Sequence, residues 1–328
     1  ATKATLVLDA PLKDFVYVAG SFNNWQPTAA YAMKKDASAG STKFWLELTG
    51  LTAGTNYTYQ YWVVDQTPLA GSPSLVKAAD PYSTLVLSPY DDGGIPATSF
   101  PNLPAYPSGQ EREVTWFKTG QTPYAWSQAT LNFVKPAKEK LVVYEVLVRD
   151  FDARRNFQDL IDKIDYFKNL KVNAIQLMPV MEFEGNESWG YNTSFHMALD
   201  KFYGTPEKLK ELIDLYHQNG ISVILDVALN HAFGRNSMVR MWMNDPDGDG
   251  FGSPTTENPY FNTVAKHSYS VGEDFNHQQA RTKNYVKRVI KQWVEEFKID
   301  GFRWDLTKGF TQNAEGSESQ TNAYQQDR

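Results

Sequence analysis

Two apolar runs in the second half of the chain each end in a carboxylate, and these carboxylates are the groups best suited to chemistry. One run leads into Asp226, Asn230 and His231, and the other carries Arg303 two positions before Asp305. Side chains alternate along a strand, so Arg303 and Asp305 share a face. A guanidinium at that spacing keeps a carboxylate ionised, as a nucleophile or a stabiliser of a cationic transition state must be. A purely structural ion pair is the better interpretation of an isolated Arg-x-Asp, but the two strand ends together favour chemistry.

A repeating strand and helix pattern must position these groups. We expect strands at 141–147, 172–178, 221–226 and 299–305, and apolar helical stripes at 157–170, 205–220 and 286–297. Thr205 and Pro206 suit the N-cap and first turn of a helix that Gly220 ends. Alternating strands and helices indicate a parallel sheet with right-handed crossovers. In a barrel of such strands the carboxyl ends form the floor of the active site, where Asp226 could accept a hydrogen bond from Arg303.

The first part of the chain predicts a separate β domain. Short alternating or aromatic-rich runs at 5–8, 15–19, 44–48 and 57–64 are separated by turn residues at sandwich-like spacing. We therefore expect an immunoglobulin-like β-sandwich over 1–87, a Pro- and Gly-rich linker over 88–140, and the strand–helix domain over 141–328.

Composition excludes several classes of protein. The 328 residues carry a formal charge of -6, which argues against a nucleic-acid partner. No run of eighteen apolar residues occurs, so we expect no membrane span. The chain has no cysteine, so disulfide and thiol chemistry are excluded and the compartment is not fixed. We expect a secreted or periplasmic protein, with a cytoplasmic location left open.

The residues around both strand ends carry a resemblance. The segments 226–231 and 301–308 resemble the first and second signature regions of the α-amylase family of glycoside hydrolases, and 144–151, 176–183, 189–192 and 203–207 are similar to further family segments. The resemblance implies a (β/α)8 TIM barrel acting on α-glucosidic bonds, of which about the first four β/α units are present. We therefore expect the chain to be a portion of a longer enzyme, with the remaining segment of the barrel as its partner.

The resemblance implies a role for each matching residue in the cleaving subsite. Asp305 would be the nucleophile, and Arg303 would hold it ionised. His231 would hydrogen-bond the sugar, Tyr191 would stack against its ring, and Asp226 would bond to its neighbours in the barrel. His231 or Tyr191 alone would more often be a packing residue.

Two further positions are assigned to substrate binding by the same resemblance. Lys308 matches a residue on the leaving-group side, and Trp189 belongs to the matching segment around Tyr191. Gly309 departs from the family, because amylases often carry His at this position. This departure weakens the inference for the leaving-group subsite.

Calcium is the expected cofactor. The resemblance implies that Asn230 is a calcium ligand. Independently, Asp245, Asp247 and Asp249 alternate in a Gly-rich turn, a spacing that suits a hard, oxygen-binding ion. A solvated acidic turn is the equal alternative, since Thr256 stands where a helix-loop-helix calcium motif has Glu. The resemblance places this turn in a loop domain over about 232–275.

The segment 18–27 resembles the start of starch- and glycogen-binding modules. Trp25 would offer a flat apolar face to sugar C–H groups, with Asn24 beside it for hydroxyls. Trp25 as a packed core aromatic is the alternative.

A retaining glycosidase needs a second carboxylate about 5 Å from the first, to protonate the leaving oxygen. Glu315 and Glu318 follow no predicted strand, so neither is assigned this role. The sequence thus predicts a retaining, α-amylase-like hydrolase of α-glucan, with a branching or debranching enzyme of the same family as an alternative. The rival class is a non-catalytic α-glucan-binding protein, which would have no need of an Arg-supported carboxylate.

Overall fold

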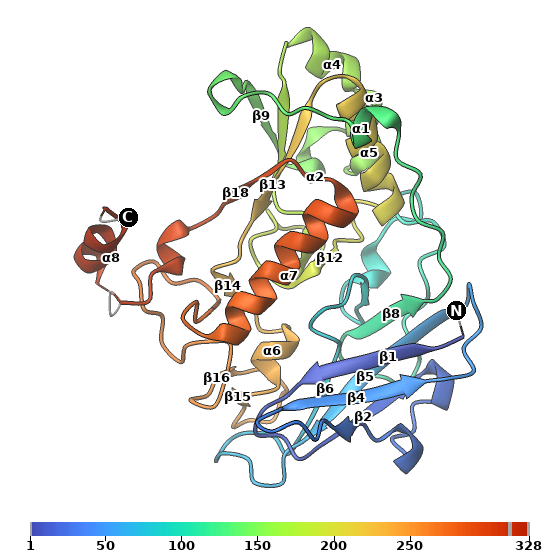
Figure 1. The fold of residues 1–328 in the computed structure, drawn as a ribbon, viewed down its shortest axis with the longest axis vertical. Helices are drawn as coiled ribbons and strands as arrows, with labels where there is room; N and C mark the ends of the chain where they lie inside the picture. Colours follow the sequence, from blue (N-terminus) through green and yellow to red (C-terminus); the bar gives the residue numbers. More distant parts are fainter. Residues whose placement is uncertain (1, 314–316, 327–328) are drawn as a thin grey trace.

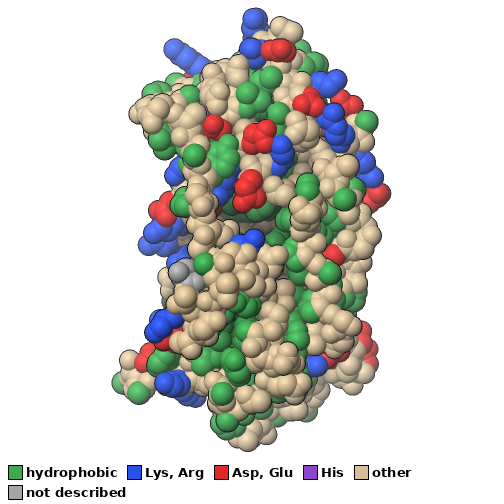
Figure 2. Space-filling model, turned by 90° about the vertical axis from the view of Figure 1, so that its right-hand side faces the viewer, with side chains coloured by type: hydrophobic (Ala, Val, Ile, Leu, Met, Phe, Trp, Pro, Cys, Tyr) green, Lys and Arg blue, Asp and Glu red, His purple; other side chains and the backbone are tan. Residues whose placement is uncertain are grey.

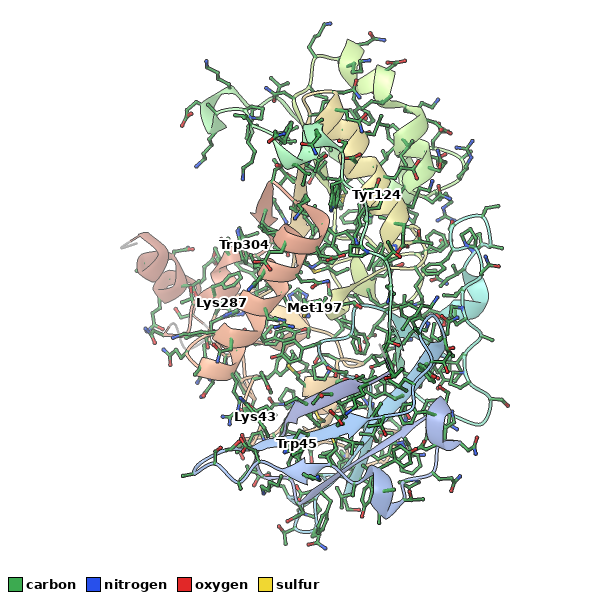
Figure 3. The ribbon with its side chains drawn as sticks, turned by 45° about the vertical axis from the view of Figure 1, so that its right-hand side comes forward. Lys43, Trp45, Tyr124, Met197, Lys287 and Trp304 are labelled. Carbon is green, nitrogen blue, oxygen red and sulfur yellow. The ribbon has the colours of Figure 1, made fainter. Side chains whose placement is uncertain are left out.

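The computed structural model describes residues 2–313 and 317–326. Antiparallel sheets from the N-terminal part lie at one end of the molecule, and parallel strands with their helices lie at the other (Figure 1). Among the side chains labelled in Figure 3, Lys43 and Trp45 belong to the N-terminal antiparallel sheets, and Trp304 belongs to the part with parallel strands.

The N-terminal part contains two antiparallel sheets, as the sequence predicts. A three-stranded sheet has the order β1-β4-β3, and a five-stranded sheet has the order β2-β5-β8-β7, with β6 also paired to β5. The strands are β1 (Ala4–Asp9), β2 (Phe15–Gly20), β3 (Lys34–Lys35), β4 (Lys43–Leu48), β5 (Asn56–Val64), β6 (Leu75–Ala78), β7 (Val86–Leu87) and β8 (Val114–Lys118).

The period-2 pattern of β4 explains how these sheets form a core. Phe44, Leu46 and Leu48 are buried, whereas Lys43 and Trp45 alternate with them on the exposed face. Burying each large apolar side chain contributes about 1.5–3 kcal/mol, which drives the two sheets together.

Strand β8 lies within the range predicted as a linker. It pairs with β5 through Asn56↔Lys118 to Tyr59↔Thr115, and with β7 through Val86 and Leu87. The five-stranded sheet therefore extends beyond residue 87. Prolines and glycines on both sides of this short strand hide its signal in the composition.

The second part contains the four predicted parallel strands, in the order β18-β13-β10-β9. They are β9 (Val143–Val146), β10 (Ala174–Leu177), β13 (Ser222–Val227) and β18 (Gly301–Trp304). Consecutive strands are neighbours, as in a (β/α)8 barrel, and β9 and β18 form the edges of this sheet.

The crossover helices are α3 (Phe157–Asp162), α4 (Ile164–Asn169), α5 (Pro206–Gln218) and α7 (Ala280–Phe297). The prediction of one continuous helix over 157–170 was wrong, because the helix breaks at Lys163 (φ −101°, ψ 18°). The prediction for α5 was right at both ends. The Thr205 side chain accepts a hydrogen bond from the Lys208 amide, and Gly220 takes φ +74° after the last turn.

The two faces of the parallel sheet differ in polarity. Ile175, Val223 and Leu225 are fully buried within the hydrophobic core that α5 and α7 share. On the opposite face, Gln176 Nε2 donates to Glu145 Oε1 at 2.8 Å. The sheet therefore presents one apolar face to the helices and one polar face.

The remaining elements interrupt the β/α pattern. Two antiparallel pairs are β11 (Met181–Phe183) with β12 (Thr193–Leu199) and β14 (His231–Ala232) with β17 (Glu273–Asp274). The pair β15 (Met243–Asn244) with β16 (Ser253–Pro254) and helix α6 (Ser237–Arg240) fall within the predicted loop domain, 232–275. Short helices are α1 (Gln128–Leu131), α2 (Val148–Phe151) and α8 (Glu318–Gln326).

None of the helices within the described residues is long and apolar enough to cross a membrane. On the face shown in Figure 2, basic and acidic side chains are interspersed, without a continuous basic patch. This distribution agrees with the net negative charge of the chain.

Candidate active site

One guanidinium nitrogen joins the two carboxylates predicted at the strand ends. Arg303 Nη1 donates to Asp305 Oδ1 at 2.6 Å and lies 3.1 and 3.2 Å from the two carboxylate oxygens of Asp226. The Tyr191 hydroxyl donates to Asp226 Oδ2 at 2.9 Å. The structure therefore brings four of the predicted site residues into one hydrogen-bonded group.

The strand register places this group. Asp226 on β13 is the direct neighbour of Arg303 on β18, and the Asp305 amide continues the ladder by donating to the Val227 carbonyl. Leu306 then turns the chain with φ +41°. Asp226 and Asp305 thus lie at the carboxyl ends of adjacent parallel strands, where ligands bind in such sheets.

The loop before β12 positions Tyr191. Gly190 has φ +92°, and a Cβ at this position would lie 2.5 Å from the Pro179 carbonyl oxygen. Only glycine fits here without strain. The same loop leaves Trp189 with 62% of its surface exposed, so its ring is available to a ligand but is not part of the hydrogen-bonded group.

The carboxylates differ in exposure. Asp226 is fully buried, and burial raises its pKa, although the hydrogen bonds from Tyr191 and Arg303 oppose that shift. The Asp305 side chain remains 22% exposed. Asp305 is therefore the carboxylate of the pair that an incoming molecule can contact.

The two donors of the group keep their protons. Burial and the charge of Asp226 raise the pKa of Tyr191, so its hydroxyl remains a donor. Burial lowers the pKa of Arg303, but its hydrogen bonds to Asp305 and Asp226 outweigh this effect and raise it overall. The guanidinium is therefore a permanent positive charge between two carboxylates.

His231 is buried beside this group. Its Nε2 lies 2.7 Å from the Tyr191 carbonyl oxygen, so in a neutral ring Nε2 carries the hydrogen. Burial lowers the pKa of His231, which favours the neutral ring. Within the described residues Nδ1 has no hydrogen-bond partner. His231 thus fixes the backbone of Tyr191 and keeps a free acceptor.

Sequence reasoning missed His196, which supports the site from β12. Its Nε2 lies 3.2 Å from the carbonyl oxygens of Ala228 and His231, and its Nδ1 lies 3.3 Å from the Tyr285 hydroxyl on α7. Burial lowers the pKa of His196 to about 4, so the ring is neutral. A single histidine within a continuous buried run gives no sequence signal beyond packing.

Lys308 and Gly309 follow Asp305 in a short 3-10 helix. Lys308 Nζ lies 5.1 Å from the ring centroid of Tyr269 and 3.7 Å from Glu318 on α8. A Cβ at Gly309 would lie 2.5 Å from the Cβ of Asn230. The departure from the family at Gly309 therefore has a steric reason in this chain.

The structure describes one of the two glutamates left unassigned in the sequence. Glu318 pairs with Lys308, and Glu315 falls outside the described residues.

The predicted calcium ligands occupy two places. Asn230 lies directly before β14, and within the described residues neither atom of its buried amide has a partner. Asp245, Asp247 and Asp249 lie together after β15, each with an oxygen within 4.8 Å of the other two. Their oxygen donors and the glycine turns at Gly248 (φ +73°) and Gly250 (φ +84°) fit a hard cation.

The predicted sugar-binding residues of the first part lie in a left-handed turn. Asn24 (φ +51°) is exposed and Trp25 (φ +59°) is half-buried. Phe22 packs against the sandwich core. Asn23, next to this turn, accepts from the Gly20 amide at 2.8 Å and donates to the Val18 carbonyl at 2.9 Å.

The chain is similar to known proteins in sequence. Residues 151–267 match the family model described as "Alpha amylase, catalytic domain". A malto-oligosyltrehalose trehalohydrolase of Saccharolobus solfataricus is 32% identical over 187 residues, which are 56% of this chain and 30% of the relative. A 1,4-alpha-glucan branching enzyme of Corynebacterium diphtheriae is 26% identical over 299 residues, 90% of this chain and 35% of the relative. The chain spans about a third of the length of these curated relatives.

A solved structure agrees with the fold. The chain superposes on a putative alpha amylase from Salmonella typhimurium with a TM-score of 0.68 and 22% identity, covering 95% of this chain and 43% of that one. At this identity the likeness concerns the fold alone. It matches both the antiparallel sheets and the parallel β/α units.

Proposed function

The chain belongs to the α-amylase family of glycoside hydrolases, and from this premise we propose that Asp305 is the nucleophile of a retaining, α-amylase-like reaction on α-glucan. One observation carries the proposal. Asp305 is a partly exposed carboxylate whose position is fixed by an arginine that is itself anchored on a buried carboxylate, Asp226. A protein that only binds glucan does not need an exposed carboxylate held by an arginine and a second, buried carboxylate.

The proposed reaction has two steps. A carboxylate oxygen of Asp305 attacks the anomeric carbon, and the bond from that carbon to the leaving oxygen breaks while the leaving oxygen takes a proton from a second carboxyl group, the general acid. Water then attacks the β-glycosyl ester and gives a proton back to the second carboxylate, which releases the sugar with retained configuration and regenerates the Asp305 carboxylate. Arg303 holds the carboxylate in place by a hydrogen bond before attack and receives it again after hydrolysis.

The neighbouring residues would hold the sugar. The Tyr191 hydroxyl is held by Asp226, and the Tyr191 backbone carbonyl is held by His231. These two contacts fix the ring in an orientation that suits stacking against the glucose unit in the cleaving subsite. The buried Nδ1 of His231, which has no partner within the described residues, would accept a hydrogen bond from a sugar hydroxyl. Lys308 would contact the leaving-group side, and the exposed Trp189 would meet a further glucose unit.

Substitution of the nucleophile tests this function. In the complete protein, Asp305→Asn should abolish the release of reducing sugar from soluble starch while leaving starch binding in place. Asp162→Asn, at an exposed position on α3, removes the same charge and serves as the matched control. Undiminished starch hydrolysis by Asp305→Asn would refute the assignment. Absence of activity in the unmodified protein, with retained starch binding, would support the rival glucan-binding function.

We further propose that Asp245, Asp247 and Asp249 bind calcium. The donor set contains only carboxylate oxygens, and one oxygen of the buried Asp245 carboxylate, Oδ1, has no partner within the described residues. Calcium accepts six to eight oxygen ligands in flexible geometry, so backbone oxygens or water would complete the shell. Direct calcium titration of chelator-treated protein tests this site, and absence of binding at millimolar calcium would exclude it.

A further inference from the structure

The acidic loop, residues 245–250, is attached to the N-terminal sheets by its backbone. The Asp245 amide donates to the Gly71 carbonyl at 2.7 Å. Gly71 approaches so closely that a Cβ there would lie 2.4 Å from Asn244 Oδ1. The start of the acidic loop is therefore fixed against the turn between β5 and β6.

Two arginines attach the other end of the acidic loop. The buried Arg240 donates from Nε to the Gly250 carbonyl at 3.0 Å and from Nη1 to the Lys77 carbonyl on β6 at 2.7 Å. Arg112, which precedes β8, donates to the Asp249 carbonyl, and its guanidinium lies 4.4 Å from the Phe251 ring. Both guanidinium groups thus bind carbonyl oxygens of the loop rather than its carboxylates.

The fit around the acidic loop is tight. A Cβ at Gly250 would lie 2.1 Å from Arg112 Nη2, and a Cβ at Gly252 would lie 1.9 Å from the Asn244 carbonyl oxygen. A change in the loop backbone would therefore move the carbonyls that the two arginines bind. The conformation of the loop and the contact with the N-terminal sheets are mechanically linked.

A second observation indicates that the acidic loop is built for a cation. Asp245 is only 8% exposed, and its Oδ2 accepts from the Gly250 amide at 3.0 Å. Its Oδ1 is buried and has no partner within the described residues. A buried acceptor without a partner is unfavourable, and more so when it is charged. A cation shared with Asp247 and Asp249 would remove this cost and the repulsion among three carboxylates.

We propose that a calcium ion in the acidic loop acts as a clamp that holds the N-terminal sheets against the β/α part of the chain. The ion fixes the loop backbone, and the loop presents the Asp249 and Gly250 carbonyls to Arg112 and Arg240. The proposal rests on the calcium site proposed above. It assigns that site a role in domain contact and not in the reaction at Asp305.

The test measures ion binding and domain contact separately. Calcium binding to chelator-treated protein is followed by calorimetry, and backbone hydrogen exchange is measured for residues 69–78 and 245–252 with and without calcium. We expect calcium to slow exchange at least tenfold in both segments. Asp247→Asn with Asp249→Asn should abolish calcium binding and the slowing, whereas Asp165→Asn, an exposed carboxylate on α4, should change neither.

Each outcome is decisive. Slower exchange in both segments supports the clamp. Calcium binding that slows exchange only in 245–252 overturns the clamp and leaves the ion site standing. Absence of calcium binding overturns both. Neither readout involves starch, so the result is independent of the role proposed for Asp305.

Discussion

Arg303 Nη1 lies 2.6 Å from Asp305 Oδ1, and the same nitrogen is held by the buried carboxylate of Asp226. The guanidinium is planar and permanently charged, so it can contact two carboxylates at once in a fixed direction. Asp305 is thereby oriented by a residue on its own strand and by a residue on the neighbouring strand.

Replacing this arginine with lysine should impair catalysis more than folding. A lysine ammonium is a single point charge on a shorter reach, so Arg303→Lys should lose the contact to one of the two carboxylates. Hydrogen bonds to charged groups contribute about 1.5–3 kcal/mol, and we therefore expect kcat on maltoheptaose to fall roughly tenfold to a hundredfold. Arg154→Lys, at an exposed arginine paired with Asp162, is the control. Wild-type kcat in Arg303→Lys would show that the bridging geometry is unimportant.

Removing the tyrosine hydroxyl should destabilise the fold. In Tyr191→Phe the buried Asp226 loses the donor at 2.9 Å and, among the described residues, keeps only the side-chain donor Arg303. Leaving a buried acceptor short of a partner costs about 1–3 kcal/mol. Urea unfolding measures the difference, and the same change at the exposed Tyr166, Tyr166→Phe, provides the comparison. If Tyr191→Phe lowered the free energy of unfolding no more than Tyr166→Phe does, the hydrogen bond from Tyr191 to Asp226 would not contribute to stability.

Buried neutral histidines should make the protein sensitive to acid. Burial lowers the pKa of both His196 and His277 to about 4, whereas an unperturbed histidine has a pKa of about 6.5. Between these values the unfolded chain binds protons that the folded chain does not, so the free energy of unfolding should fall as pH drops from about 6.5 to about 4. Each histidine contributes a slope of at most about 1.4 kcal/mol per pH unit.

Urea unfolding at pH 7.0, 6.0 and 5.0 checks this dependence. Glutamine at position 196 can still donate to the carbonyls of Ala228 and His231, but it does not titrate. The free energy of unfolding of His196→Gln should therefore change less steeply with pH than that of the wild type, and the difference should equal the contribution of one histidine. Equal slopes would mean that His196 is protonated equally in the folded and unfolded states.

The steric contact at Gly309 predicts intolerance to any side chain. A methyl group there would lie 2.5 Å from the Asn230 Cβ, so Gly309→Ala should lower the free energy of unfolding by about 1–3 kcal/mol. Gly234→Ala introduces the same methyl group where no atom lies within 4 Å. Thermal unfolding of both variants measures the effect, and equal melting temperatures would argue against the close packing of Asn230.

Much of the fold follows from local patterns that the sequence displays. The alternation around Phe44 predicts β4, and Thr205 with Pro206 predicts the start of α5, because each pattern has one physical cause. Strand β12 was not predicted, because all its residues are buried and the period-2 signal disappears. Strand β8 was not predicted, because its pairing with β5 is a long-range contact within a Pro-rich stretch.

The candidate site likewise has features that local sequence patterns predict and features that they do not. The sharing of one face by Arg303 and Asp305 follows from strand geometry, and the structure shows their contact. The support from His196 depends on β12 lying beside β14 and α7, which no local pattern encodes. The link from the acidic loop to the N-terminal sheets likewise depends on long-range contacts, over 137 positions from Arg112 to Asp249 and over 163 positions from Arg240 to Lys77.

Trapping the covalent intermediate tests the central claim most directly. A 5-fluoro-α-glucosyl fluoride carries a leaving group that departs without general-acid protonation, so its reaction reports on the nucleophile whichever residue is the acid. After incubation of the complete protein, peptide mass spectrometry should find one fluoroglucosyl group on Asp305, lost again as activity recovers. A label on another carboxylate, or turnover of the reagent with Asp305 replaced by Asn, would contradict the account.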